Sequence, residues 1–416
     1  MLRTASILTF LGLALSLSAH AATYYVDRVN GSDDANGLSS NSAWSSLAKV
    51  SNSKFQPGDR ILLRRGQRWS ERLTVSSSGS LDLPLYIGAY GTGNRPMLDG
   101  TNVALAEDAY GLLAIEGHLN VTVCGLEVRA SARSGAHIYS SSGIRLCDMS
   151  INNNIGNGVL VFDSSQVVIE QSEIFSNSQA PWDSFAGIRI DAAGGTWKGF
   201  TIQNCKIHHN LGGADWASGN GIALGNTGSE IPTLEQVLIE SNQIYSNGNP
   251  DQNQAGRGIT ASIHGDVTVL GNSVASNASA GIYLGDYGLH LNLTIERNYF
   301  YNNALRQFGG TTEGWATARY NTILVDTPDI TAMGIEIGGL GTWTITNNVL
   351  RYTTATDDAW RGFIRINDSD QDQHLVSDYN LFYSAGPRRW KRSNDQAIDF
   401  RAWQKFGFDQ HSVAPQ

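Results

Sequence analysis

The sequence of 416 residues predicts an all-β solenoid, and three observations lead to this prediction. An eleven-residue phrase, clearest as VLIESNQIYSN at 237–247 and LTIERNYFYNN at 293–303, recurs about ten times. Within each copy, apolar and polar residues alternate in twos, which is the period of a β-strand. The sixth place is Asn in six successive copies. Strand alternation in a repeat whose period lies in the twenties predicts one coil of a parallel β-helix per copy.

The spacing of the copies supports a solenoid of about ten coils. The closest copies begin 23 residues apart, and insertions stretch the others. Leucine-rich repeats share this period, but the Leu-rich consensus and the helical segments that they need are absent here. The copies begin at Val121, Ile144, Val167, Phe200, Val237, Val267, Leu293, Ala316, Trp343 and Leu375.

The Asn at the sixth place predicts a ladder of stacked side chains at one bend of each coil. Asn tolerates the left-handed backbone of a tight bend, and its amide can hydrogen-bond along a stack of identical neighbours. Earlier copies carry Leu126, Met149, Ser172 and Cys205 at this place, so the ladder should occupy the C-terminal half. Its members are Asn242, Asn272, Asn298, Asn321, Asn348 and Asn380.

A second short strand, written G-I-x-[ILV], precedes most copies and should be the first strand of each coil. Alternation sends every second side chain of this strand inward as an aliphatic stack and the others outward onto one flat face. The inward set is Ile188, Ile190, Ile222, Leu224, Ile259, Ile282, Leu284, Ile335 and Ile337.

Composition and the first residues predict an exported protein that acts on neither nucleic acid nor membrane. The stretch MLRTASILTFLGLALSLSAHA, 1–21, has one Arg, an apolar core and a small-x-small end, which is typical of a cleaved signal peptide. The apolar core is too short to span a bilayer. Formal net charge is −9, and no basic run is present. We expect a secreted or periplasmic monomer.

The three cysteines leave a pairing question open. Cys124 and Cys147 hold the same place in adjacent copies, so their backbones should lie roughly 4.8 Å apart. We expect two stacked free thiols inside the fold, with an inter-coil disulfide as the alternative. Cys205 is expected in the core.

The two ends of the chain resemble a known group. TYYVDRVNGSDDANGLSSNSAWSSLAKV, FQPGDRILLRRGQRW and PLYIGAYGTGNRPMLDG near the start, and DYNLFYSAGPRRWKRSNDQAIDFRAWQKFGFDQHS near the end, are similar to secreted right-handed parallel β-helix proteins of the pectin-lyase-like superfamily. The resemblance implies one right-handed β-helix domain over 22–416. Its parts would be an N-terminal cap at about 22–70, coils at about 71–385 and a closing segment at about 386–416.

Long insertions around 178–257 predict a groove over the middle coils, because insertions in a solenoid collect on one face. Outward residues of the first strands would form its floor, which is low at Ala223. Arg189, Asp191, His264 and Tyr283 are the candidate catalytic residues. Trp182, Trp216, Arg257 and Glu336 are the candidate substrate-binding residues, although the two Trp rings would equally suit a cap on the apolar stack. Asp183 and Asp215 are candidate ligands of a calcium ion.

Two reactions fit a groove of this kind on an extracellular polysaccharide. A lyase removes the proton beside a uronate carboxylate, and Arg or calcium neutralises that carboxylate. An inverting glycoside hydrolase needs two carboxyl groups about 6.5–9.5 Å apart, such as Asp191 with Asp286 or Asp215 with Glu336.

The signature motifs of the superfamily's known enzymes are not found in the sequence. Pectate lyases carry a clustered Asp run with a Lys on the face, and alginate lyases, epimerases and polygalacturonases carry other motifs that are absent here. We therefore expect first a lyase on an acidic, uronate-containing glycan. The alternatives are an inverting glycoside hydrolase and a non-catalytic carbohydrate-binding or matrix protein.

Overall fold

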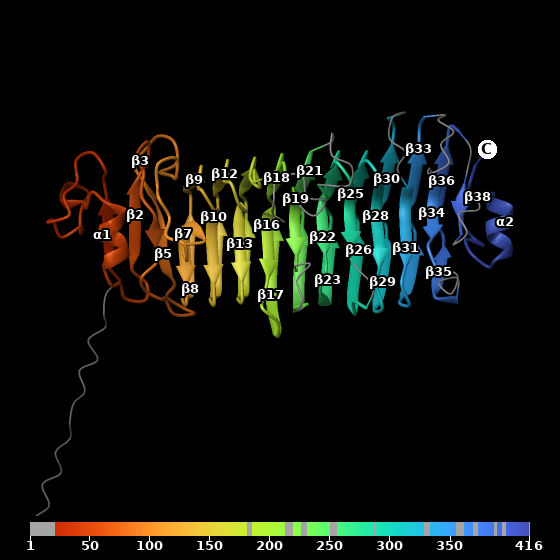
Figure 1. Cartoon of the computed structure of the whole chain (residues 1–416), viewed down its shortest axis with the longest axis horizontal. Coiled ribbons are helices and arrows are strands. Elements are labelled where there is room, and N and C mark those ends of the chain that lie inside the picture. The colour runs from red at the N-terminus through yellow and green to blue at the C-terminus, as the bar shows by residue number, and fades with distance from the viewer. Residues whose placement is uncertain are drawn as a thin grey trace, which may run out of the picture.

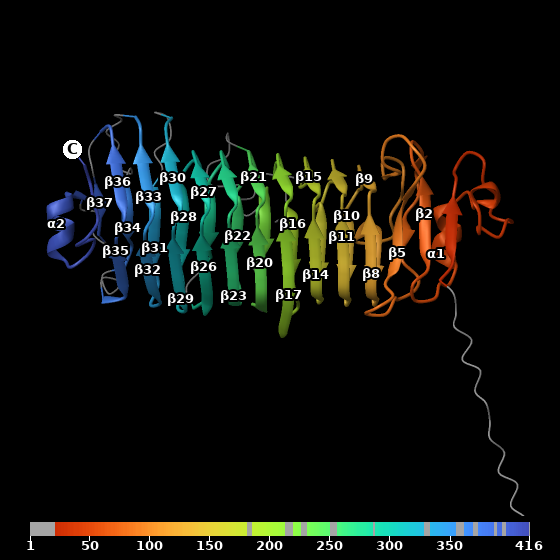
Figure 2. The ribbon, with the colours of Figure 1, turned by 180° about the vertical axis from the view of Figure 1, so that it is seen from behind.

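Three long β-sheets run along the molecule, and Figures 1 and 2 show their strands stacked in a row between one helix at each end. The computed structural model describes residues 21–180, 185–212, 219–225, 231–249, 256–285, 288–327, 333–354, 362–368, 373–386, 389–392 and 397–415. The predicted all-β solenoid is confirmed.

Successive strands enter the three sheets in turn, so that three strands make one coil. Sheet A contains β1 (Thr23–Val26), β2 (Arg60–Arg64), β5 (Leu85–Tyr90), β8 (Leu119–Cys124), β11 (Ser142–Cys147), β14 (Ser165–Glu170), β17 (Thr196–Gln203), β20 (Thr233–Glu240), β23 (His264–Leu270), β26 (Leu291–Glu296), β29 (Trp315–Arg319), β32 (Thr342–Thr346) and β35 (Leu375–Asp378). Sheet B contains β3 (Arg68–Trp69), β6 (Met97–Asp99), β9 (Glu127–Arg129), β12 (Ser150–Asn152), β15 (Glu173–Phe175), β18 (Lys206–His208), β21 (Gln243–Tyr245), β24 (Ser273–Ala275), β27 (Tyr299–Tyr301), β30 (Thr322–Val325), β33 (Val349–Tyr352) and β36 (Leu381–Ser384). Sheet C contains β4 (Leu73–Thr74), β7 (Gly111–Glu116), β10 (Ser134–Tyr139), β13 (Val159–Phe162), β16 (Ala186–Asp191), β19 (Asn220–Leu224), β22 (Ile259–Ala261), β25 (Ala280–Leu284), β28 (Arg306–Thr311), β31 (Met333–Gly338), β34 (Gly362–Ile366), β37 (Trp390–Lys391) and β38 (Ala397–Ile398).

The sequence repeat and the coil are the same unit. The residues that begin the ten copies, from Val121 in β8 to Leu375 in β35, pair with one another in a single register across sheet A. The first strand of each coil lies in sheet C and the last in sheet B. All of the nine predicted inward residues are buried in one continuous apolar cluster.

The predicted Asn ladder is present at the bend between sheets A and B. Nδ2 of Asn242 donates to Oδ1 of Asn272 at 3.0 Å. The same contact continues at 2.9–3.1 Å through the remaining members, Asn298, Asn321, Asn348 and Asn380. Each Oδ1 also accepts the backbone N–H of the preceding Asn, so a single side chain satisfies two donors of its neighbour.

The left-handed backbone at this bend belongs to the residue before the Asn. The expectation that the ladder Asn itself takes this conformation is wrong, because positive φ occurs at place five of the phrase. The contribution of the Asn at this bend is its side-chain amide. The residues with positive φ are Gly125, Asp148, Gln171, Asn204, Ser241, Gly271, Arg297, Tyr320, Asn347 and Tyr379.

A second ladder, which was not predicted from the sequence, lies between sheets B and C at the last place of six successive phrases. Its amides hydrogen-bond in series at 2.7–3.2 Å, and Gln307 closes it by accepting from the last Asn at 2.9 Å. The members are Asn154, Asn177, Asn210, Asn247, Asn277 and Asn303. The sequence signal for this second ladder was the Asn that stands at place eleven of many copies.

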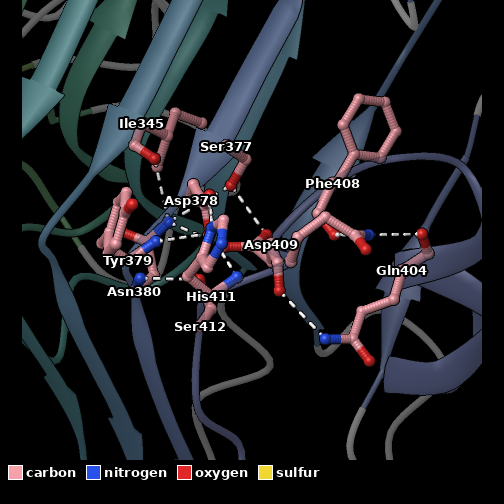
Figure 3. Close-up of polar contacts among 11 residues, drawn as sticks. Ile345, Ser377, Asp378, Tyr379, Asn380, Gln404, Phe408, Asp409, His411 and Ser412 are labelled. Atoms are coloured by element: carbon pink, nitrogen blue, oxygen red, sulfur yellow. Dashed lines mark hydrogen bonds and ion pairs between the residues drawn. The ribbon is translucent and has the colours of Figure 1, made fainter.

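A buried carboxylate terminates the first ladder at the C-terminal end (Figure 3). Oδ1 of Asp409 accepts from Nδ2 of Asn380 at 2.9 Å, and Oδ2 accepts from Oγ of Ser377 at 2.7 Å. Nε1 of Trp403 also donates to Oδ2 at 2.8 Å. Trp403 belongs to α2 (Phe400–Lys405). The closing helix is thereby joined to the end of the solenoid by hydrogen bonds.

At the N-terminal end, α1 (Leu47–Asn52) packs against β4 and buries Leu47 and Val50. A short 3₁₀ helix, η1 (Ser40–Ser42), precedes it. β1 and β2 already belong to sheet A, so residues before 70 take part in the sheets. The division into signal peptide, cap, coils and closing segment stays a prediction, and residues 1–20 lie outside the described ranges.

Cys124 and Cys147 form a disulfide between β8 and β11, with their Cα atoms 4.6 Å apart. The expectation of free thiols is therefore wrong, and the alternative pairing holds. Both side chains lie on the outer face of sheet A, because the fourth place of the phrase points outward. Cys205 is a buried free thiol in the core, as predicted, and burial raises its pKa to about 12. In the part of the chain that the structure describes, no helix is long and apolar enough to cross a membrane.

Candidate functional site

The outer face of sheet C carries the predicted floor of the groove. Outward side chains at the middle of each strand form one column, in the order His137, Leu160, Arg189, Ala223, Thr260, Tyr283, Gly309, Glu336 and Arg365. Arg189, Tyr283 and Glu336 therefore share one face, as predicted. Ala223 separates Arg189 from Thr260, which makes the floor low at that point. Arg189 and Tyr283 are three strands apart, or roughly 14 Å.

Arg189 and Asp191 form an ion pair on β16. Nη2 of Arg189 lies 2.9 Å from Oδ2 of Asp191, and the backbone N–H of Ala192 donates to Oδ1 at 2.9 Å. Asp191 is only 3 % exposed. Burial raises its pKa, and the neighbouring Arg189 only partly offsets this effect. A carboxyl group in this environment can act as a proton donor.

A cavity of about 560 Å³ lies over β7, β10, β13 and β16, with this ion pair at one end. Aromatic and aliphatic side chains supply most of its wall, and six polar residues converge on it. The apolar wall consists of Tyr110, Tyr139, Leu160, Phe162 and Phe185. The polar residues are Asp108, Glu116, His137, Asn157, Arg189 and Asp191.

Glu116 and His137 form the polar end of the cavity opposite Asp191. Nδ1 of His137 lies 3.1 Å from Oε1 of Glu116, and Nη2 of Arg72 lies 3.1 Å from the same oxygen. Burial lowers the pKa of His137, although Glu116 opposes this shift. Neither residue was predicted from the sequence as part of a site. Outward alternation in GLLAIE and SGAHIY was a signal for them, but these strands precede the long insertions.

A second polar cluster lies further along the same face, around Tyr283 on β25. The guanidinium carbon of Arg257 is 4.1 Å from the centre of the Tyr283 ring, and that of Arg306 is 5.3 Å from it. Nη1 of Arg306 pairs with Oε2 of Glu336 at 2.8 Å, and Nδ2 of Asn367 donates to Oε1 at 2.9 Å. The structure thus brings three predicted residues, Arg257, Tyr283 and Glu336, together through Arg306.

His264 does not lie on this face. It opens β23 in sheet A, where its ring centre is 5.9 Å from that of His290 and its Nδ1 accepts from the backbone N–H of His290 at 3.1 Å. The chain leaves sheet C after Ala261, so the alternation that starts at Thr260 does not reach residue 264. The predicted position of His264 is therefore wrong.

Four predicted site residues, Trp182, Asp183, Asp215 and Trp216, lie outside the described residues, as does Asp286. Within the described ranges, no group of three or more His, Cys, Asp or Glu side chains is placed to hold a metal ion. Asp183 and Asp215 lie outside these ranges, so a calcium ion held by them stays a prediction.

Comparison with known proteins identifies the fold. The family model described as "Right handed beta helix region" matches residues 87–249 and 186–350, which together cover more than half of the chain. A lacto-N-biosidase of Bifidobacterium longum is 33 % identical over 92 residues, which are 21 % of this chain and 6 % of that protein. The chain thus spans only a small fraction of this curated relative.

Two solved structures match this chain at low sequence identity. Pectate lyase Pel9A matches with a TM-score of 0.54 and 16 % identity, over 82 % of this chain and 81 % of that one. A GH136 lacto-N-biosidase from Eubacterium ramulus matches with a TM-score of 0.49 and 13 % identity, over 94 % of this chain and 68 % of that one. At these identities the likeness concerns the fold. With its three parallel sheets in one register and its matching repeats, the chain belongs to the right-handed β-helix family.

Proposed function

We propose that this protein is an exported polysaccharide lyase that cleaves a uronate-containing glycan by β-elimination. The observation that carries the proposal is Tyr283, which lies on the outer face of sheet C between the guanidinium groups of Arg257 and Arg306. A protein with a net charge of −9 needs local cations to hold an acidic polymer, and these two provide them.

The chemistry follows from the position of the two cations. A guanidinium group that pairs with the uronate carboxylate stabilises the negative charge that spreads onto it when the neighbouring C5 proton leaves. Tyr283 in its deprotonated form takes this proton. The electrons of the C5–H bond form the C4–C5 double bond, the bond from C4 to the glycosidic oxygen breaks, and that oxygen receives the proton that Tyr283 took from C5. The product carries an unsaturated uronate at its new end.

Glu336 and Asn367 position one of the cations. The carboxylate of Glu336 holds Arg306 at 2.8 Å and is itself fixed by Asn367 at 2.9 Å. Because Glu336 is only 8 % exposed, its charge acts mainly on Arg306. We expect Glu336→Gln to weaken substrate binding by loosening Arg306, with a smaller effect on kcat than the loss of Tyr283.

The test measures ultraviolet absorbance of unsaturated uronate ends with pectate, alginate, glycosaminoglycans and neutral glycans, each with calcium and with a chelator. We expect one acidic glycan to give a rising trace. Tyr283→Phe should then lower kcat about 100-fold or more, because it removes the base. Tyr383→Phe, on the outer face of sheet B, is the matched control and should retain full activity. A flat trace with every acidic glycan, or an unchanged rate for Tyr283→Phe, would refute this proposal.

One observation favours inverting glycoside hydrolysis as the second candidate. The raised pKa of Asp191 suits a general acid. Glu116 lines the same cavity, but the backbones of the two residues are three strands apart, roughly 14 Å, which is wider than the separation of about 6.5–9.5 Å between carboxyl groups that inversion requires. New reducing ends without absorbance, lost in Asp191→Asn, would favour this candidate. Binding of a glycan without cleavage would favour a carbohydrate-binding or matrix protein.

A further inference from the structure

The cavity over β7, β10, β13 and β16 lies apart from Tyr283 on the same face. Leu160, at its centre, is four strands from Tyr283 in the column, or roughly 19 Å. The volume of the cavity, about 560 Å³, lies within the usual range of small-molecule sites. A ligand held there would not touch the Tyr283 cluster unless it were a chain of several sugars.

The apolar wall of the cavity suits the flat C–H face of a sugar ring. Tyr139 on β10 and Phe162 on β13 are register partners, and their ring centres are 6.2 Å apart. Tyr139 is 41 % exposed, so its ring is accessible. Aromatic rings of this kind offer an apolar face together with a polar edge, which is the surface that a pyranose needs.

The polar end of the cavity offers hydrogen-bond acceptors. Both contacts of Glu116 use Oε1, and among the described residues its Oε2 has no hydrogen-bond partner. Because Nδ1 of His137 faces the Glu116 carboxylate, Nδ1 carries the proton and the neutral ring keeps Nε2 as an acceptor. Burial lowers the pKa of His137, which keeps the ring neutral. Two fixed acceptors suit the hydroxyl donors of a sugar.

The charges of the cavity disfavour an anionic ligand. Its lining includes three carboxyl groups, Asp108, Glu116 and Asp191, and only one guanidinium, Arg189. Arg189 is already paired with Asp191, and Arg72, which is not among the lining residues, is paired with Glu116. A carboxylate or sulfate group on a ligand would meet net negative charge there.

We propose that this cavity is a binding site for a neutral pyranose, in which the ring stacks on Tyr139 and Phe162 and its hydroxyl groups donate to Glu116 and His137. The site is separate from the Tyr283 cluster and does not depend on the lyase proposal. If both hold, the natural glycan contains uncharged sugars as well as uronates.

The experiment is isothermal titration of the whole mature protein with lactose, cellobiose, mannobiose and xylobiose, and with digalacturonate as the charged probe. We expect at least one neutral disaccharide to bind. Tyr139→Ala should weaken this binding about tenfold or more, and Glu116→Gln should weaken it by a similar factor. Tyr383→Ala is the matched control, because Tyr383 is equally exposed at 40 % and lies on sheet B.

Thermal melts of each variant exclude unfolding as the cause of lost binding, and Phe162→Leu provides a second variant that keeps the wall apolar. Tyr283→Phe should bind the neutral probe as the unmodified protein does, so failure of the lyase proposal and failure of this one give different results. The inference is overturned if no neutral probe binds, if digalacturonate displaces the neutral probe, or if Tyr139→Ala and Glu116→Gln leave the affinity unchanged.

Discussion

Asp409 lies outside the repeats, but its carboxylate accepts several hydrogen bonds at the C-terminal end of the solenoid. It is 0 % exposed and accepts hydrogen bonds from Ser377, Asn380, Trp403 and Ser412. Without it, the indole N–H of Trp403 and the hydroxyl of Ser377 would be buried donors that lose their acceptor. A buried donor without a partner costs roughly 1–3 kcal/mol.

We predict that Asp409→Ala lowers the free energy of unfolding by about 3 kcal/mol, because several buried donors lose their acceptor together. Urea unfolding followed by circular dichroism measures the change. Asp82→Ala is the control, because Asp82 is exposed and should give a change within about 0.5 kcal/mol. Equal midpoints for the two variants would contradict the role assigned to Asp409.

The bends between strands are the elements that the repeat specifies most strictly. At the bends that carry a ladder, a left-handed residue precedes the Asn, and the Asn hydrogen-bonds to neighbouring coils. Asn298 is typical: its Oδ1 accepts from Nδ2 of Asn272 at 3.0 Å, and its Nδ2 donates to the backbone O of Val269 at 2.8 Å and to Asn321 at 3.1 Å.

We predict that Asn298→Ala destabilises the protein by about 3 kcal/mol, because it interrupts the ladder and leaves buried backbone groups unpaired. Asn277→Ala in the second ladder should cost a similar amount. The control is Asn102→Ala at an exposed position, which should be nearly neutral. The melting temperatures of the three variants test this prediction. A ladder variant with the same melting temperature as the Asn102→Ala variant would contradict it.

At the scale of the whole molecule, stability depends on groups that burial keeps neutral. Desolvation by burial lowers the pKa of His118, His137 and His208 below the ordinary value of 6.5. The unfolded chain therefore binds more protons than the folded one just below that value, and stability falls as the pH falls through it.

Asp99 affects stability at lower pH. Burial alone would raise its pKa, but hydrogen bonds from Thr101 and the charges of Arg68 and Arg129 lower it below 3.8.

We predict that the melting temperature decreases between about pH 7 and pH 5, before the carboxylates are protonated, and decreases further below about pH 4. Calorimetry across this range measures it. His137→Gln should reduce the slope between pH 7 and pH 5, because it removes one of the three groups. A melting temperature that is constant from pH 7 to pH 5 would show that these histidines do not control stability.

The amino-acid sequence alone was sufficient to predict the repeat, the register and the first ladder. Strand alternation and the Asn at place six are local signals, and each copy repeats them, so the residues that begin the copies align with one another directly. The inward aliphatic residues followed for the same reason, because alternate side chains of a strand point to opposite sides of the sheet.

Which residues meet on one face depends on the tertiary structure. His264 has the alternation of sheet C, but a bend at 262–263 moves it into sheet A, and a bend changes which side every later residue faces. Alternation could place His137 on the outer face, but the sequence did not show which residues Arg306 and His137 contact, because their partners Glu336 and Glu116 lie in neighbouring coils that are 30 and 21 residues away in the chain. The cysteine pairing also depends on the tertiary structure. The strand register places the Cα atoms of Cys124 and Cys147 4.6 Å apart, and both side chains point to the same side of sheet A, so the two sulfur atoms can bond.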